Sequence, residues 1–234
     1  MGKAKKRSAI IVGAGSGLSA SFARKLASEG TELVLAARDD TKLTALAAET
    51  GATTVRCDAC VPEEVDALFA AAEKTFGVPD LVLYNASFRT RGDFEGLNRD
   101  LVRKTLDVTA YGAFLVAQRA AQVMLPRGSG AIFFTGASAS VKGYSKSAPF
   151  AMGKFALRGL AQSMARELSP KNIHVAHFVI DGGIGDTSDP RAAGRGEDGL
   201  LHPDAIAESY WQVYCQHRSA WSWELELRPW AEKF

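Results

Sequence analysis

The chain has 234 residues, of which 47% are apolar and 23% charged, and its formal net charge is +2. These are ordinary values for a globular protein, without the charge excess that favours nucleic acid or an anionic membrane surface. No apolar run reaches the roughly 20 residues that span a bilayer. The N-terminal residues lack the apolar core of a secretory signal, so we expect a cytoplasmic protein.

The three cysteines provide no disulfide framework, which agrees with a reducing compartment. Cys57 and Cys60 form a C-x-x-C pair, but no second pair of cysteines or histidines follows at ligand spacing. We therefore predict no metal site.

Short apolar runs alternate with longer helical patterns, which predicts βαβ units and a largely parallel sheet. We expect one doubly wound α/β domain over residues 1–234, with a mostly parallel seven-stranded sheet and helices on both faces. The expected strands are 8–12, 32–37, 53–57, 81–84, 131–135, 173–180 and, as an edge strand, 223–227. The expected helices are 17–29, one ending at residue 50, 62–76, 101–124 closed by Pro126, 149–168 and 203–216.

One long irregular stretch, 181–202, is rich in glycine, aspartate and arginine and follows the sixth expected strand. Ligands of doubly wound sheets bind outside the carboxyl ends of the strands, where long loops can cover them. We therefore expect this stretch to be a lid over a small-molecule substrate.

The first expected strand turns into the first helix through Gly13-Ala14-Gly15-Ser16-Gly17-Leu18. Glycines at such a turn let the backbone approach a pyrophosphate, which the helix N-terminus then stabilises. The second strand ends at Ala37 and Arg38. A carboxylate there would bind the ribose 2′-hydroxyl of NAD, whereas Arg38 offers a charged fork to the 2′-phosphate of NADP. The sequence thus predicts a Rossmann-like nucleotide-binding fold that prefers NADP to NAD.

Together with four further motifs, this turn makes the chain resemble the short-chain dehydrogenase/reductase (SDR) family over nearly its whole length. The motifs are Asp58 after the third strand, Tyr84-Asn85-Ala86-Ser87 after the fourth, Phe150-Ala151-Met152-Gly153-Lys154 on a helix, and Asp181-Gly182-Gly183-Ile184 after the sixth strand. Ser19 stands where the family's turn has its last glycine.

The resemblance implies a place for each part of the cofactor. Asp58 and Ala59 would hold the adenine, Asn85 and Ala86 would line a ribose, Lys154 would bind the nicotinamide ribose, and Ile184 would meet the carboxamide. The cofactor-binding residues expected in this way are Gly13, Gly15, Ser16, Gly17, Leu18, Arg38, Asp58, Ala59, Asn85, Ala86, Lys154, Gly182 and Ile184.

The resemblance also implies a catalytic tyrosine whose pKa is lowered by a lysine, a serine that holds the carbonyl, and an asparagine that organises a proton-relay water. On this chain the tyrosine position holds Phe150, the asparagine position holds Thr109, and the serine spacing falls on Ala137. Lys154 is kept. Because Phe150 and Lys154 are four residues apart on a helix, they share one face.

Other groups could replace the missing acid. General acid–base catalysis contributes about 10²–10⁴-fold and an oxyanion-stabilising donor roughly 10²–10³-fold. Ser138 and Tyr144 are the best replacements, and Lys154 could act through a water because burial lowers the pKa of an amine. The candidate catalytic positions are Lys154, Ser138, Tyr144, Phe150 and Thr109.

Three functions remain open. The first is an NADP(H)-dependent oxidoreductase with an atypical site, acting on imines or conjugated acceptors that need no strong acid. The second is a carbonyl reductase in which Tyr144 or Ser138 supplies the proton. The third is a catalytically silent NADP-binding protein that serves as a partner subunit or sensor. A branch of the family with Phe at this position and a kept Lys has an Arg-Pro-Trp tail, similar to Arg228-Pro229-Trp230.

The helices expected at 101–124 and 149–168 carry wide apolar stripes that include Phe114 and Leu157. The resemblance implies that such helices pack together in a homodimer or homotetramer. Burial within one chain is the alternative.

Overall fold

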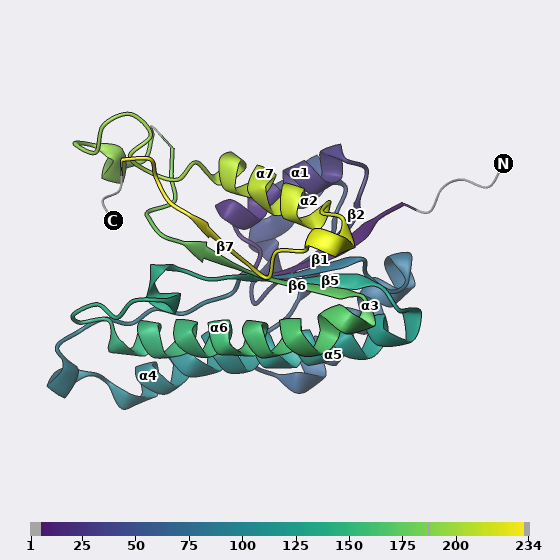
Figure 1. The fold of residues 1–234 in the computed structure, drawn as a ribbon, viewed down its shortest axis with the longest axis horizontal. Coiled ribbons are helices and arrows are strands. Elements are labelled where there is room, and N and C mark those ends of the chain that lie inside the picture. Colours follow the sequence, from purple (N-terminus) through teal and green to yellow (C-terminus); the bar gives the residue numbers. More distant parts are fainter. Residues whose placement is uncertain (1–5, 187, 232–234) are drawn as a thin grey trace.

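The computed structural model describes residues 6–186 and 188–231. Its centre is a seven-stranded sheet in the order β3-β2-β1-β4-β5-β6-β7, in which every neighbouring pair is parallel (Figure 1). The doubly wound fold is thus confirmed, and the sheet is entirely rather than mostly parallel. The strands are β1 (Ser8–Val12), β2 (Glu32–Ala37), β3 (Thr53–Arg56), β4 (Leu81–Tyr84), β5 (Gly130–Thr135), β6 (Ile173–Ile180) and β7 (Glu224–Leu227).

Helices cover both faces of this sheet (Figure 1). One face carries α1 (Leu18–Ser28), α2 (Thr44–Thr50) and α7 (Pro203–Tyr214). The other carries α3 (Pro62–Phe76), α4 (Arg99–Leu106), α5 (Gly112–Arg127) and α6 (Ala148–Leu168). None of the helices in the described ranges is both long and apolar enough to cross a membrane.

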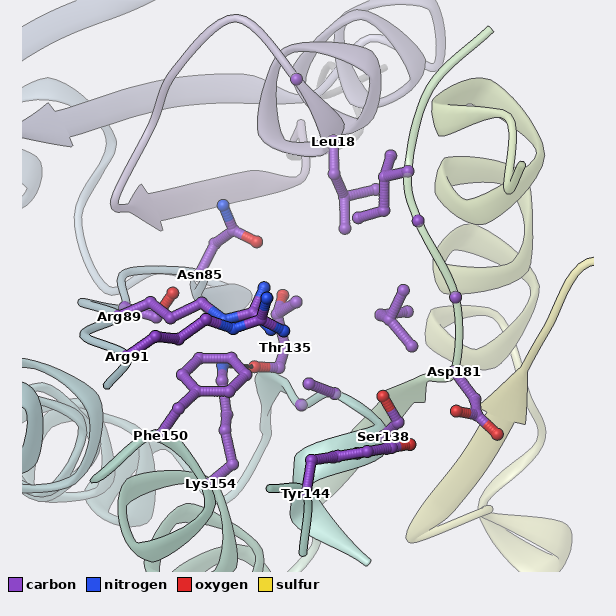
Figure 2. A pocket seen from close by; sticks show the side chains of 18 of the residues that line it. Leu18, Asn85, Arg89, Arg91, Thr135, Ser138, Tyr144, Phe150, Lys154 and Asp181 are labelled. Atoms are coloured by element: carbon purple, nitrogen blue, oxygen red, sulfur yellow. Dashed lines mark hydrogen bonds between the residues drawn. The ribbon is translucent and has the colours of Figure 1, made fainter. Parts of the chain in front are cut away.

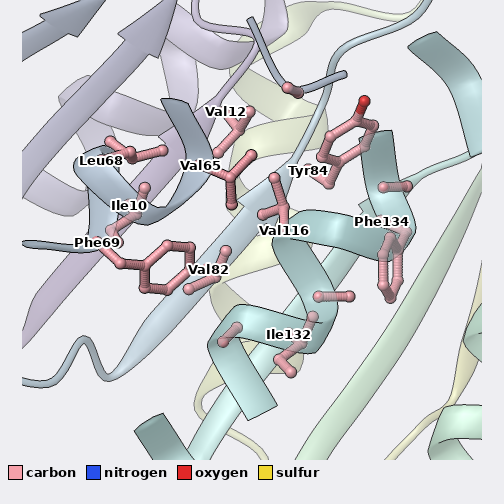
Figure 3. Packing of buried hydrophobic residues seen from close by; sticks show 14 of the residues in the cluster. Ile10, Val12, Val65, Leu68, Phe69, Val82, Tyr84, Val116, Ile132 and Phe134 are labelled. Carbon is pink, nitrogen blue, oxygen red and sulfur yellow. The ribbon is translucent and has the colours of Figure 1, made fainter. Parts of the chain in front are cut away.

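Alternate residues of the strands feed two separate buried clusters, because successive side chains of a strand point to opposite faces. Ile10 and Val12 of β1 pack with α3 and α5, as Figure 3 shows, whereas Ala9 and Ile11 pack toward α1 and α7. Both faces of the strand are therefore buried, which explains why its sequence is an almost continuous apolar run.

The helix predicted at 101–124 is not continuous. A π-helical turn, Asp107–Tyr111, separates α4 from α5. Here the hydroxyl of Tyr84 donates to the Val108 carbonyl, and a Cβ on Gly112 would lie only 2.7 Å from that hydroxyl. A side chain that bonds to a helix carbonyl is a recognised cause of such irregularity. Pro126 also lies inside the last turn of α5, which ends at the left-handed Gly128. The bounds of the other predicted elements agree with the structure to within two residues.

Candidate active site

A crevice lies at the carboxyl ends of the strands, at the point where the strand order reverses between β1 and β4. It has two parts, with volumes of about 670 and 490 Å³, and both are lined by Asn85 and Ser87. The smaller part lies between the glycine turn and Arg38. The larger part reaches Phe150 and Lys154 on α6 (Figure 2). Doubly wound sheets bind nucleotides at this switch point.

The glycine turn forms a smooth wall of this crevice. Gly13 has a φ of +79°, and a Cβ there would lie 2.4 Å from the backbone nitrogen of Ala86, so only glycine fits. A Cβ on Gly15 or Gly17 would meet no other atom within 4 Å, because both face open space. The hydroxyl of Ser19 accepts from the Gly15 nitrogen at 2.9 Å. This hydrogen bond closes the turn.

The N-terminus of α1 also faces this space. No described side chain caps it at Gly17, so the first backbone N–H groups have no side-chain acceptor. Such a helix end attracts an anion through its N–H groups and its dipole. The turn and helix therefore fit a dinucleotide pyrophosphate.

At the other end of the smaller part, Arg38 follows β2. Among the described residues no carboxylate forms an ion pair with Arg38, so its guanidinium is available to an anion. Asp58 and Ala59 line the same part. One Asp58 oxygen accepts from the Cys60 nitrogen at 3.0 Å, and the Asp58 nitrogen donates to Glu64 at 2.7 Å, which fixes this loop.

In the larger part, Lys154 is 3% exposed, and its ammonium group donates to the Thr135 carbonyl at 2.7 Å. Burial lowers the pKa of Lys154 to about 7. Its Nζ lies 5.8 Å from the centre of the Phe150 ring. The spacing of four residues thus places both side chains at the crevice, but the ring offers no hydrogen-bonding atom.

The other predicted catalytic residues separate into two groups. Ser138 and Tyr144 line the crevice with Phe150. Thr109 does not line it. Thr109 is fully buried in the π-helical turn, where its hydroxyl accepts from the Phe88 nitrogen at 3.4 Å. The structure therefore leaves Thr109 behind the crevice wall. Every predicted cofactor-binding residue, in contrast, lines one part of the crevice or both: Gly13, Gly15, Ser16, Gly17, Leu18, Arg38, Asp58, Ala59, Asn85, Ala86, Lys154, Gly182 and Ile184.

Three arginines that sequence reasoning did not single out also line the larger part. Arg89 and Arg91 follow β4, and Arg195 comes from the 181–202 segment. The guanidinium carbon of Arg89 lies 4.9 Å from the centre of the Phe150 ring. The only sequence signal was a pair of arginines two residues apart, shortly after the carboxyl end of a central strand.

A buried polar network fixes the loop that carries Ser138. The side chains of Ser140 and His177 lie 3.3 Å apart, and His177 Nδ1 lies 3.0 Å from Glu224. Arg158 donates twice to Glu224, at 2.7 and 2.8 Å. Burial lowers the pKa of His177 to about 4, so the imidazole is neutral at pH 7. Because Ser140 is fully buried, this network positions the loop and offers no accessible nucleophile.

The C-terminal tail holds both the base and the tip of the 181–202 segment. Arg228 pairs with Asp181 at 3.1 Å. A Cβ on Gly182 would lie 2.5 Å from Pro229, and the Trp230 indole donates to the Glu197 carbonyl at 2.9 Å. The Arg-Pro-Trp sequence thus contacts the predicted lid at two places.

Comparison with known proteins agrees with this geometry. A family model described as enoyl-(acyl carrier protein) reductase matches residues 13–198. The 3-oxoacyl-[acyl-carrier-protein] reductase MabA of Mycobacterium bovis is 30% identical over 186 residues, which cover 80% of this chain and 72% of MabA. A short-chain dehydrogenase structure from Rhodopseudomonas palustris is 36% identical, with a TM-score of 0.82, and the match covers 96% of this chain and 99% of that one.

A more distant structure shows the same fold. A single-site variant of the actinorhodin polyketide ketoreductase, with NADPH, is 22% identical, with a TM-score of 0.84 and a match over 96% of both chains. The fold, the crevice and these matches place the chain in the short-chain dehydrogenase/reductase family, whose members are NAD(P)-dependent oxidoreductases.

Proposed function

We propose that this chain is an NADP(H)-dependent oxidoreductase that transfers hydride to or from a small organic substrate, at a carbonyl, imine or activated alkene. The observation that carries the proposal is the pairing of two features in one crevice. Arg38, without an anionic partner among the described residues, lies at one end, and buried Lys154 lies at the other. When bound, NADPH would supply the hydride.

The chain's own residues would divide the remaining tasks. The glycine turn and α1 would hold the pyrophosphate, Arg38 the 2′-phosphate, and Lys154 the nicotinamide ribose. Ile184 and Gly182 would border the nicotinamide from the lid side. The 181–202 segment would cover the substrate, and its contacts with the C-terminal tail support that role.

We also propose that Phe150 occupies the place of the family's acid, which makes the site atypical. A phenyl ring cannot give a proton to a developing alkoxide. The groups proposed to do so are Lys154, acting through a water, and the Ser138 and Tyr144 hydroxyls that line the same crevice. Imines that are already protonated, and conjugated acceptors that form stabilised anions, need the least help. They are the substrate types that this site suits best.

The cofactor proposal is tested by NADPH fluorescence titration of the native chain and of Arg38→Ser. A hydrogen bond to a charged group contributes about 1.5–3 kcal/mol, so we expect NADPH to bind about 10- to 100-fold more weakly to the variant. NADH affinity should not change, because NADH has no 2′-phosphate. Arg166→Ser, an equal change on the exposed side of α6, is the matched control. An equal loss for both coenzymes, or no binding to the native chain, would contradict the proposal.

Turnover distinguishes the three hypotheses about function once NADPH binding is measured. Turnover of imines or conjugated acceptors alone supports the function proposed above. Ketone turnover that Tyr144→Phe or Ser138→Ala abolishes indicates an ordinary carbonyl reductase with a replaced acid. Binding of NADPH with no turnover of any of these substrates leaves the silent cofactor-binding protein.

We further propose a homodimer or homotetramer built through the helices on the α5–α6 face. Phe114 on α5 and Met152 and Phe155 on α6 are exposed by 39%, 49% and 46%, and Tyr111 stacks on Phe114 with ring centres 6.4 Å apart. Such a group of exposed apolar side chains is typical of a protein interface. Of the two residues named for the predicted stripes, Phe114 stays exposed, whereas Leu157 is fully buried within the chain. The proposal therefore depends on Phe114, Met152 and Phe155.

Light scattering of the native chain should give two or four times the 25.0 kDa of one chain. Phe155→Asp should lower that mass, because a carboxylate inside an apolar interface loses its hydration. Phe94→Asp, which changes an exposed phenylalanine on the loop before α4, should leave the mass unchanged. A native mass of 25.0 kDa would contradict the proposal.

A further inference from the structure

The end of the crevice near Phe150 holds positive charge that the proposed hydride chemistry does not use. The larger part of the crevice, which contains this end, is lined by three arginines, a lysine and one carboxylate: Arg89, Arg91, Arg195, Lys154 and Asp181. The carboxylate already has partners, since Asp181 pairs with Lys142 at 2.9 Å and with Arg228 at 3.1 Å. The arginines that line this end therefore have no carboxylate of their own within it.

Arg89 and Arg91 lack an anionic partner elsewhere too. Across residues 6–186 and 188–231, no side chain forms an ion pair or a hydrogen bond with either guanidinium. Burial, and the like charge of Arg91 next to it, lower the pKa of Arg89. Two neighbouring cations repel each other, and a bound anion would relieve this repulsion.

The pair is directed at the place where a substrate would lie. Arg89 is attracted to the face of the Phe150 ring, which is negative and lies 4.9 Å from the guanidinium carbon. The two arginines are two residues apart on an extended segment, and Figure 2 shows that their side chains run in the same direction beside the Phe150 ring. The segment is anchored, since the Gly92 nitrogen donates to the Lys146 carbonyl at 3.1 Å and Lys146 pairs with Asp93 at 2.9 Å.

The cofactor's own phosphates have other donors under the proposed function. Gly13 to Ser16 and Arg38 line the smaller part of the crevice, and Gly17 and Leu18 line the larger part. Arg89 and Arg91 line only the larger part, with Ser138, Tyr144 and Phe150. In Figure 2, Leu18 at the start of α1 lies across the crevice from the two arginines. The positive charge of Arg89 and Arg91 is thus available to the second ligand, the substrate.

We propose that Arg89 and Arg91 form the recognition site for an anionic group on the substrate. The natural substrate is then a carbonyl, imine or conjugated acceptor that carries a carboxylate or a phosphate. The planar guanidinium fork pairs with both of these oxyanions through two parallel hydrogen bonds. This inference rests on the proposed function for the reaction itself, but the anion site can be tested without turnover.

The test begins with NADPH affinity, measured for the native chain, Arg89→Gln, Arg91→Gln and Arg99→Gln. Arg99 is exposed at the start of α4 and does not line the crevice, so Arg99→Gln controls for the loss of one positive charge. Each protein is then titrated calorimetrically, with and without NADPH, using three unreactive probes. These are malonate, methylphosphonate and the neutral malonamide.

We expect the native chain to bind at least one anion and not the amide. Arg89→Gln and Arg91→Gln should each weaken that anion about 10- to 100-fold, because each removes a charged hydrogen-bond donor. Arg99→Gln should behave as the native chain. Preference for malonate indicates a carboxylate on the substrate, and preference for methylphosphonate indicates a phosphate.

Four results would overturn the inference. The first is a native chain that binds neither anion, and the second is one that binds malonamide as well as malonate. The third is an Arg99→Gln variant that loses as much anion affinity as the crevice variants do. The fourth is a loss of NADPH affinity in Arg89→Gln and Arg91→Gln with anion binding unchanged, which would assign these arginines to the cofactor. Absence of NADPH binding by the native chain counts against the proposed function instead, and the titration without NADPH still decides the anion site.

Discussion

Phe150→Tyr should reduce an unactivated ketone about 10²–10⁴-fold faster than the native chain, which is the usual contribution of a positioned general acid. The Phe150 ring already faces the crevice, 5.8 Å from Lys154 Nζ and 4.9 Å from the Arg89 guanidinium carbon. A hydroxyl on this ring would lie among cations, which favour the phenolate and lower the pKa of the phenol. The variant would therefore gain an acid whose pKa lies closer to neutral pH than that of a free phenol.

The measurement is kcat/KM with NADPH for an unactivated ketone and for a protonated imine. The ketone should gain strongly and the imine little, because the imine needs no proton from the protein. Phe94→Tyr adds the same hydroxyl to an exposed phenylalanine on the loop before α4 and should change neither rate. If Phe150→Tyr binds NADPH normally but reduces the ketone no faster than the native chain, another group already delivers the proton. The Tyr144→Phe and Ser138→Ala variants then identify it.

Most of the fold was predictable because both faces of the central strands are buried. Residues 8–12 and 173–180 are apolar throughout or nearly so, and each is a strand with every residue buried. The π-helical turn was not predictable, because it involves a hydrogen bond from Tyr84, which belongs to strand β4. A helical pattern read along one segment contains no information about such a partner.

The candidate site was also predictable only in part. The glycine turn and Arg38 were found from local spacing, since a strand followed by a helix brings them to one end of the sheet. Arg89 and Arg91 were missed because a loop has no periodicity, and because Arg89 lies against Phe150, some sixty residues later in the chain. Thr109 was a candidate because it stands at the position of the family's asparagine. The structure instead places it inside a helix irregularity, packed near Gly153.

Lys154→Met should make the protein more stable near pH 6, by about 2–4 kcal/mol. Burial lowers the pKa of Lys154 from 10.5 to about 7. Below pH 7 the lysine is protonated in both states, so the folded chain carries the full cost of a buried charge, at about 1.4 kcal/mol per pKa unit. Loss of the hydrogen bond to the Thr135 carbonyl offsets about 1–3 kcal/mol of the gain, because that acceptor is left unpaired.

The advantage of Lys154→Met should shrink as the pH rises from 7 toward 10.5. In this interval the unfolded chain binds a proton at Lys154 and the folded chain does not, so the native protein gains stability with pH. Methionine does not titrate, so it adds no such pH dependence to the free energy of unfolding. Urea unfolding of both proteins at pH 6, 7, 8 and 9 gives the difference in free energy of unfolding at each pH. Lys74→Met, which changes an exposed lysine on α3, should show no pH-dependent difference. A Lys154→Met variant that is less stable than the native chain at pH 6, by an amount that does not change with pH, would show that Lys154 stays charged and well paired in the folded protein.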